Sequence, residues 1–173
     1  MSIKRIILVG KAASGKTWLA EQLIEMGYKF PLTYTTRPAR PNEIDGVHYH
    51  FVEPSKFNNM IANDSMYEYV EFNGWFYGRT KEDFYAGNLL IMTPAGISQM
   101  NESDRNSSYI IYLDIDEDIR SERLSERNDV DDVQRRLKAD EEDFKDFKDF
   151  DYRISSPNFT CAGVQMLIDK IIR

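Results

Sequence analysis

The sequence has little cysteine, no long apolar run and no surplus of positive charge. The single cysteine, Cys161, excludes an internal disulfide and fits a reducing compartment. No stretch approaches the roughly 18 apolar residues of a membrane span, and the first residues lack the apolar core of a signal peptide. Because 22 Lys and Arg stand against 29 Asp and Glu, we expect no extended basic face for nucleic acid. These absences predict a cytoplasmic protein that binds neither nucleic acid nor membrane.

Length and composition favour one folded domain over residues 1–173. A chain of this size with 42% apolar and 13% aromatic residues can bury a substantial core. The net charge of -7 is unevenly distributed, since residues 114–151 alone hold sixteen acidic and eight basic side chains. Cations that cluster elsewhere in the chain are therefore not part of a general basic coating.

Apolar runs and helical patterns alternate along most of the chain. Continuous apolar runs, typical of strands buried on both faces of a parallel sheet, occupy residues 3–10, 88–93, 108–115 and, less clearly, 151–155. Helical patterns occupy residues 16–26, 97–102, 117–126, 130–148 and 160–172. This alternation predicts a layered α/β fold with right-handed crossovers.

The stretch from residue 33 to 86 breaks that alternation. Its segments HYHFV, MYEYVEF and WFYGR are strand-like. Asn73-Gly74, between the last two, is a strong hairpin signal because a type I′ turn needs positive φ at both central residues. We therefore expect an inserted, mostly antiparallel lobe.

GKAASGKT, residues 10–17, fits the pattern G-x-x-x-x-G-K-[ST] between a predicted strand and a predicted helix. In that context backbone N–H groups surround phosphate oxygens, and the helix N-terminus adds positive potential. Lys16 would reach the β- and γ-phosphates, and the Thr17 hydroxyl would ligate Mg²⁺. A glycine turn with an exposed lysine is the alternative, and the flanking strand and helix disfavour it. The predicted ATP-binding residues are Gly10, Ala12, Ala13, Ser14, Gly15, Lys16 and Thr17.

TYTTRPARPNEIDGVHYHF, residues 33–51, places Arg37 and Arg40 close together in an acidic chain. Planar guanidinium groups match phosphate oxygens bidentately, and the flanking prolines stiffen the segment. A solvated cluster of loop charges is the competing interpretation. We favour a local anion-binding site.

Three patterns in this region resemble the guanylate kinase family: TTR-x-x-R, the D-G-x-x-Y that follows it, and E-x(5)-G-x-x-Y-G in MYEYVEFNGWFYGR. The resemblance runs nearly end to end, through the helical region 119–144 to DYRISS. It implies a P-loop NTPase fold with a three-layer parallel-sheet core, residues 1–32 and 87–173. It also implies an inserted monophosphate-binding lobe, 33–86, and a helical lid, about 120–148. The implied reaction transfers the γ-phosphoryl group of ATP, with Mg²⁺, to GMP or dGMP.

The resemblance also assigns roles to individual residues. It implies that Glu68 reads guanine, because one carboxylate can accept hydrogen bonds from both N1–H and the N2 amino group. The implied ligands of the acceptor's monophosphate are Arg37, Arg40, Tyr49 and Tyr77. Further implied acceptor contacts are Thr33, Arg79 and Thr93. The implied catalytic residues are Lys16, Arg127 and Arg136. Positive charge suits that role because catalysis of phosphoryl transfer rests on positioning and charge neutralisation.

The sequence departs from the family at three places. Ile91 and Thr93 stand where the family has aspartates, Arg79 stands where it has a small hydroxyl residue, and SSPNF replaces an asparagine-containing turn near the donor's adenine. Arg79 would either add a third cation at the phosphate or pair with Glu68 and spoil the reading of guanine. These departures keep open a kinase of the same fold with a shifted acceptor, such as another deoxynucleotide or a phosphorylated sugar.

Two further interpretations concern the helical region and the class of protein. We expect Arg120, Arg123 and Arg135 to form ion pairs on an exposed helix, because acidic residues surround them. A catalytically weak module that binds nucleotides or proteins is the alternative to an enzyme, and the intact P-loop disfavours it. The expected partners are small nucleotides, and the expected assembly is a monomer or a homodimer.

Overall fold

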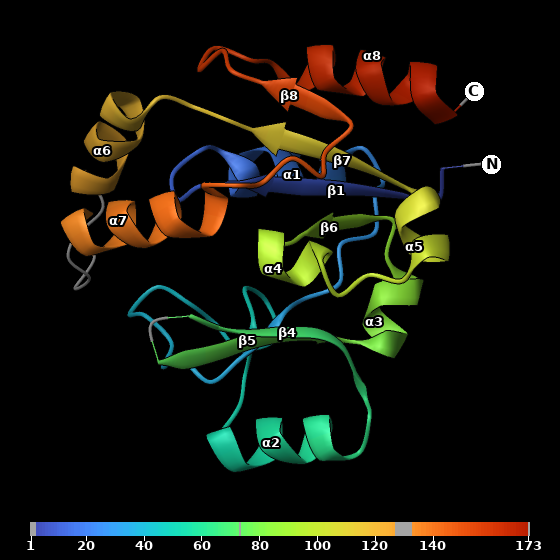
Figure 1. Ribbon diagram of the computed structural model, residues 1–173, viewed down its shortest axis with the longest axis vertical. Helices are drawn as coiled ribbons and strands as arrows, with labels where there is room; N and C mark the ends of the chain where they lie inside the picture. Colours follow the sequence, from blue (N-terminus) through green and yellow to red (C-terminus); the bar gives the residue numbers. More distant parts are fainter. Residues whose placement is uncertain (1–2, 73, 127–132, 173) are drawn as a thin grey trace.

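The computed structural model describes residues 3–72, 74–126 and 133–172 (Figure 1). Its strands form two four-stranded sheets, which we call sheet A and sheet B. Sheet A contains β1 (Arg5–Gly10), β6 (Leu89–Ile91), β7 (Ser108–Leu113) and β8 (Tyr152–Ile154). Sheet B contains β2 (Tyr34–Thr35), β3 (His50–Phe51), β4 (Met66–Phe72) and β5 (Trp75–Thr80). Figure 1 shows the sheets one above the other, with the chain passing from A to B and back.

Sheet A is entirely parallel in the order β6-β1-β7-β8. Its strands confirm the four predicted apolar runs, because a central parallel strand is buried on both faces and every residue of β1 is buried. Ile6 and Leu8 point to one face, which α1 (Lys16–Glu25) and α8 (Cys161–Ile172) cover. Ile7 and Val9 point to the other face, toward α3 (Lys81–Ala86) and α4 (Pro94–Ile97). The three-layer α/β core is therefore confirmed.

The predicted helix over residues 97–102 is wrong. Two short helices flank that position, α4 and α5 (Glu102–Asn106). Thr93 caps α4 by accepting a hydrogen bond from the Gly96 N–H at 3.0 Å, and Asn101 caps α5 in the same way. The two capping side chains begin separate helices, because each satisfies an N–H group that a continuous helix would bond internally.

Sheet B is mixed, in the order β3-β2-β5-β4. β2 pairs antiparallel with β5, which pairs antiparallel with β4, whereas β2 and β3 are parallel. The mostly antiparallel pairing agrees with the prediction. Asn73 lies outside the described residues, and Gly74 beside it has a φ of 76°. The lobe also contains α2 (Pro54–Ala62), which lies beneath sheet B in Figure 1 and was not predicted.

The remaining helices, α6 (Glu117–Ser125) and α7 (Val133–Phe144), pack against each other and against the loop that follows β1. After α7, the side chains of Phe144, Phe147 and Phe150 surround Tyr112 of β7, with ring centroids 5.3–5.5 Å from it. This aromatic cluster joins the end of α7 to sheet A. No helix in the described ranges is long and apolar enough to cross a membrane.

Candidate active site

The P-loop forms the predicted strand–loop–helix unit at the C-terminal end of β1. Gly15 precedes α1 with a φ of 100°, a left-handed conformation that glycine adopts without a steric penalty. Ala13 also has positive φ, 58°, which is uncommon for a residue with a Cβ atom. Its methyl group packs against Leu124 of α6 and Leu137 of α7, and this packing holds the loop in that conformation.

Lys16 lies over the loop rather than in solvent. Its Nζ donates hydrogen bonds to the carbonyl oxygens of Gly10 at 2.6 Å and Lys11 at 2.8 Å. The Ser14 hydroxyl, on the buried side of the loop, is 3.4 Å from the same Nζ. Thr17 is exposed on the first turn of α1. The Lys16 ammonium group therefore lies at the start of the loop, and Thr17 stands on the helix turn that follows the loop.

The helices α6 and α7 supply two residues beside the P-loop, Asp140, which the sequence interpretation missed, and Arg120, to which it gave no role at the loop. Asp140 of α7 accepts a hydrogen bond from the Ala12 N–H at 2.7 Å. Arg120 of α6 lies 3.3 Å from the Asp140 carboxylate and donates to the Ile115 carbonyl at 3.0 Å. Burial raises the pKa of Asp140, and the Ala12 hydrogen bond opposes that rise. The buried Arg120–Asp140 pair therefore joins α6 to α7, and the Ala12 hydrogen bond joins α7 to the P-loop.

Arg120 forms the expected ion pairs, at 4.0 Å from Glu117 and 3.3 Å from Asp140, but its side chain is only 1% exposed, so the expectation of an exposed position is wrong. Arg123 is half-buried and donates to the Ala13 carbonyl at 3.1 Å, so it contacts the P-loop. Both side chains also reach the P-loop, more than 100 positions away, and local charge patterning carried no signal for those contacts. The side chains of Arg135 and Arg136, like the whole of Arg127, lie outside the described residues.

The two faces of sheet B have different roles, because successive side chains of a strand point to opposite faces. Phe76 of β5 stacks on Phe57 of α2, with ring centroids 5.5 Å apart, so this face is the packed one. Tyr77 and Arg79, one residue on either side of Gly78, point to the opposite face. On that face Arg79 meets the end of β6, since its Nη2 is 3.5 Å from the Ile91 carbonyl. The predicted acceptor residues of β5 thus lie between the two sheets.

Arg37 and Arg40 converge on one carboxylate, that of Glu43. Arg37 Nη2 lies 2.8 Å from both carboxylate oxygens. The Arg40 N–H donates to Oε2 at 2.9 Å, and Arg40 Nη1 lies 3.7 Å from Oε1. Burial favours protonation of Glu43, but the hydrogen bonds from Arg40 and Arg37 outweigh it, so the pKa lies below its ordinary value. Two arginines thus hold one carboxylate, in the arrangement that the sequence analysis predicts for a bound phosphate.

The two predicted tyrosines lie beside these arginines. The Arg37 guanidinium is 5.6 Å from the centre of the Tyr49 ring, and the Tyr49 and Tyr77 rings are 6.3 Å apart. Burial raises the pKa of Tyr49, so its hydroxyl keeps its proton and can donate it to an anion. The structure therefore brings all four predicted phosphate ligands together. Glu43 was missed, although its spacing of three residues from Arg40 offered a signal.

Glu68 and Arg79 are directly paired across β4 and β5. Arg79 Nη1 lies 3.7 Å from Glu68 Oε1, and Arg79 Nη2 donates to the Thr33 hydroxyl at 3.1 Å. Of the two roles considered for Arg79, the structure shows the pairing with Glu68. Burial raises the pKa of Glu68, and Arg79 opposes that rise. Thr93 lies nearby at the end of β6, where its hydroxyl caps α4.

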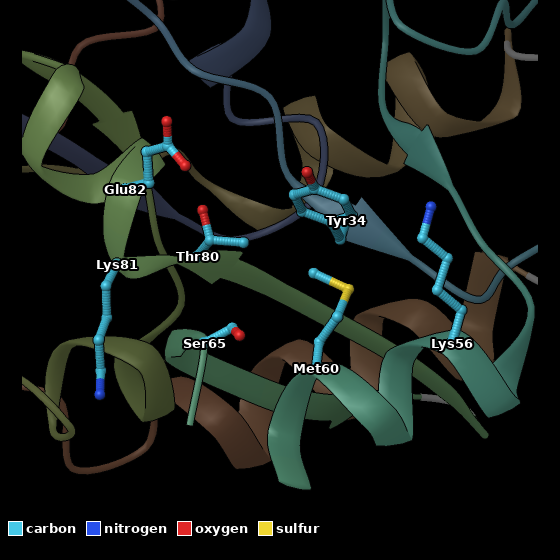
Figure 2. Close-up of a pocket in the computed structure, with 7 residues that line it drawn as sticks. All are labelled: Tyr34, Lys56, Met60, Ser65, Thr80, Lys81 and Glu82. Atoms are coloured by element: carbon cyan, nitrogen blue, oxygen red, sulfur yellow. The ribbon is translucent and has the colours of Figure 1, made fainter. Parts of the chain in front are cut away.

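A surface pocket of about 470 Å³ lies on the packed face of sheet B, away from the residues just described (Figure 2). Figure 2 shows Lys56 and Met60 of α2 opposite Tyr34 and Thr80. Because Thr80 and Arg79 are adjacent in β5, their side chains point to opposite faces. This pocket is therefore separate from the proposed acceptor site.

Comparisons with known proteins identify the family of the chain. The family model for guanylate kinase matches residues 2–170. The guanylate kinase of Acinetobacter baylyi is 32% identical over 91% of this chain and 82% of its own length. That of Nostoc sp. is 30% identical over 94% of this chain and 86% of its own length. A crystal structure of guanylate kinase from Anaplasma phagocytophilum matches with a TM-score of 0.73, over 100% of this chain and 86% of that one. At 23% identity, that likeness shows a shared fold. Because the family model matches nearly the whole chain, this chain belongs to the guanylate kinase family.

Proposed function

We propose that the protein transfers the γ-phosphoryl group of ATP to GMP or dGMP. The observation that carries this proposal is the convergence of Arg37 and Arg40 on the Glu43 carboxylate, beside two tyrosine hydroxyl groups. A monophosphate has the charge and the oxygen geometry to take the place of that carboxylate. The family to which the chain belongs supports the same reaction.

The donor site is the P-loop. Its backbone N–H groups would surround the ATP phosphates, and Lys16 would exchange the carbonyls of Gly10 and Lys11 for phosphate oxygens. Thr17 would hold Mg²⁺ through its exposed hydroxyl, and the ion would neutralise the transferring phosphoryl group. The described residues contain no group of three acidic, His or Cys side chains able to hold a metal. A single protein hydroxyl suits Mg²⁺, which usually keeps water and phosphate oxygens as its other ligands.

The acceptor site is the face of sheet B that points to sheet A. Arg37, Arg40, Tyr49 and Tyr77 would hold the monophosphate, and Glu68 would accept hydrogen bonds from guanine. Contacts with both ends of the acceptor would align its phosphate with the γ-phosphate of ATP, which supplies much of the rate enhancement of such a transfer. The lid residues Arg127 and Arg136 remain proposed contributors of positive charge. We also propose a cytoplasmic location.

A shifted acceptor is the second candidate, and a specific observation favours it. Glu68 is already paired with Arg79, and the end of β6 carries Ile91 and Thr93 in place of carboxylates. An acceptor without a guanine base would not need the Glu68 carboxylate for hydrogen bonds, so Glu68 could stay paired with Arg79. The two candidates differ in which nucleoside monophosphate is consumed.

The test is ADP release in a coupled assay with ATP and Mg²⁺ against GMP, dGMP, AMP, CMP, UMP, dTMP and no acceptor. Turnover confined to GMP and dGMP, and absent in Lys16→Ala, is the expected result. Turnover with a different acceptor would replace the proposal with the shifted kinase. ADP release that no acceptor stimulates would overturn kinase function altogether.

A further inference from the structure

The P-loop holds one residue, Ala13, in a backbone conformation that alanine does not favour. Its φ of 58° lies in the left-handed region, which a residue with a Cβ atom enters only at a cost in free energy. Gly15, two residues later, has a φ of 100° without that cost, because glycine lacks a Cβ atom. A strained residue persists only where its surroundings hold it, so the contacts around Ala13 must offset its preference for the right-handed region.

The backbone of the preceding residue, Ala12, is enclosed by a ring of polar contacts. Its N–H donates a hydrogen bond to Asp140 Oδ2 at 2.7 Å. The same Oδ2 lies 3.3 Å from Arg120 Nη1, which in turn lies 3.5 Å from the Ala12 carbonyl oxygen. That carbonyl belongs to the peptide plane whose orientation sets φ of Ala13. The acid–base pair therefore fixes one side of the strained dihedral, and Arg123, which donates to the Ala13 carbonyl at 3.1 Å, fixes the peptide plane on the other side.

The Arg120–Asp140 pair is more than packing between α6 and α7. Both side chains are buried, and a buried ion pair by itself contributes little to stability, because desolvation of the charges offsets their attraction. Two apolar side chains would join the helices as well. The pair is instead aimed at the backbone of Ala12, while Arg120 Nε is anchored on the Ile115 carbonyl at 3.0 Å. A polar arrangement directed at one residue of the P-loop points to a role in the shape of the loop.

We propose that Asp140 is a positioning residue for ATP binding, whose hydrogen bond with the Ala12 N–H keeps Ala13 in the left-handed conformation. The N–H groups of residues 14–16 are then arranged around the phosphate site before ATP arrives. The inference rests on the proposed function, in which the P-loop is the donor site. Without the bond, Ala13 returns to the right-handed region in most free molecules. ATP then binds only the minor conformer, and its apparent affinity falls by the fraction of molecules in that conformer.

The experiment measures the Kd of ATP and the Kd of GMP, each alone with Mg²⁺, by titration calorimetry. Asp140→Ala should raise the Kd of ATP about tenfold, the scale of the preference of an L-residue for the right-handed region, and should leave the Kd of GMP unchanged. Asp140→Asn loses the charge, but its amide oxygen can still accept the Ala12 N–H, so it should retain most of the affinity for ATP. If the ion pair were only structural, both variants would bind ATP alike.

Ala13→Gly tests whether the effect passes through the strained residue. Glycine populates the left-handed region about as readily as the right-handed one, so the loop then depends much less on Asp140. In the Ala13→Gly background, Asp140→Ala should raise the Kd of ATP only about twofold. Glu117→Ala is the matched control, because Glu117 is also an acid paired with Arg120, at 4.0 Å, but lies at the exposed start of α6. Its Kd for ATP should equal that of the wild-type protein.

An unchanged or lower Kd of ATP in Asp140→Ala, with normal GMP turnover by the wild-type protein, would overturn the inference and leave the kinase function standing. Equal effects of Asp140→Ala with and without Ala13→Gly would overturn it as well. If Asp140→Ala does not fold, the double variant Arg120→Met with Asp140→Ala removes both buried charges together and takes its place in the same comparisons. A wild-type protein that binds ATP but phosphorylates no GMP would reject the proposed function, and the same Kd values would still decide the inference.

Discussion

Asp104 is the centre of a buried network that joins sheet A to sheet B, and its replacement gives the sharpest stability test. Its Oδ2 accepts hydrogen bonds from the hydroxyl groups of Tyr67 at 2.8 Å and Tyr85 at 2.9 Å, and from Asn101 Nδ2 at 2.6 Å. Its other carboxylate oxygen pairs with Arg5 at 3.5 Å. Burial raises the pKa of Tyr67, and the hydrogen bond to Asp104 raises it further. Each of these groups comes from a different element, so one carboxylate ties together β1, β4, α3 and the start of α5.

Asp104→Ala should lower the free energy of unfolding by about 3–5 kcal/mol, because it leaves the buried Arg5 without its counter-ion. That loss is a large part of the roughly 5–15 kcal/mol by which a domain is stable. Asp104→Asn should cost less, since the amide oxygen can still accept a hydrogen bond from a tyrosine hydroxyl. Urea unfolding, followed by both fluorescence and circular dichroism, measures the difference.

The same network should affect the acceptor site, because Tyr67 directly precedes Glu68 in β4. We expect Asp104→Asn to raise the KM for GMP and to leave the KM for ATP unchanged, since none of the partners of Asp104 belongs to the P-loop. A loss below about 1 kcal/mol in Asp104→Ala would refute the reasoning that the carboxylate compensates a buried charge. Equal losses for the two variants would show that the missing charge accounts for the loss and that the hydrogen bonds to the carboxylate contribute little.

Three further predictions concern the site itself. Lys16→Ala should lower kcat by about a hundredfold or more, because one preorganised charge is removed from the transferring phosphate, while urea unfolding stays close to that of the wild-type protein. Arg40→Ala should raise the KM for GMP and lower kcat, since contacts at the phosphate also align it, and steady-state kinetics with an unchanged KM for ATP would confirm the location. Glu43→Gln should be less stable than the wild-type protein at pH 7, because the pKa of Glu43 is lowered in the folded state. That advantage of the wild-type protein is present above the ordinary glutamate pKa and should disappear as the pH falls through the lowered value, which urea unfolding at several pH values would show.

The sequence predicted the core of the fold because its strands are buried on both faces. Burial of that kind leaves a continuous apolar run, and β1, β6 and β7 each retain one. The P-loop was predictable for a similar reason, since Gly15 and Lys16 stand at the boundary between a strand and a helix. The helices α2 and α3 were missed. The local signal of α3 was the cap Thr80, whose hydroxyl accepts the Asp83 N–H at 3.1 Å, and that of α2 was a proline, Pro54, in its first turn.

The candidate site was predictable where it depends on short motifs and not where it depends on distant partners. The positions of Arg37 and Arg40 follow from one segment, and the structure brings them together. Arg120 was misread because an arginine among acidic residues is usually solvated, and only contact with Asp140, twenty residues later, explains its burial. The hydrogen bond from the Ala12 N–H to Asp140 joins residues 128 positions apart, and no periodicity or spacing in the sequence predicts such a contact.

The described site uses one physical device three times, in Arg37 with Glu43, Arg79 with Glu68, and Arg120 with Asp140. In each case a cation is oriented by an acid of the same chain before any nucleotide binds. Orienting a long side chain in advance removes part of the entropy cost of binding, because the rotamers are already restricted. Binding of GMP also requires that its phosphate replace the Glu43 carboxylate, so the phosphate must bind Arg37 and Arg40 more strongly than Glu43 does. A dianionic phosphate does so through its greater charge, whereas a neutral ligand such as a nucleoside does not, so the acceptor site should select for the monophosphate before it selects for the base.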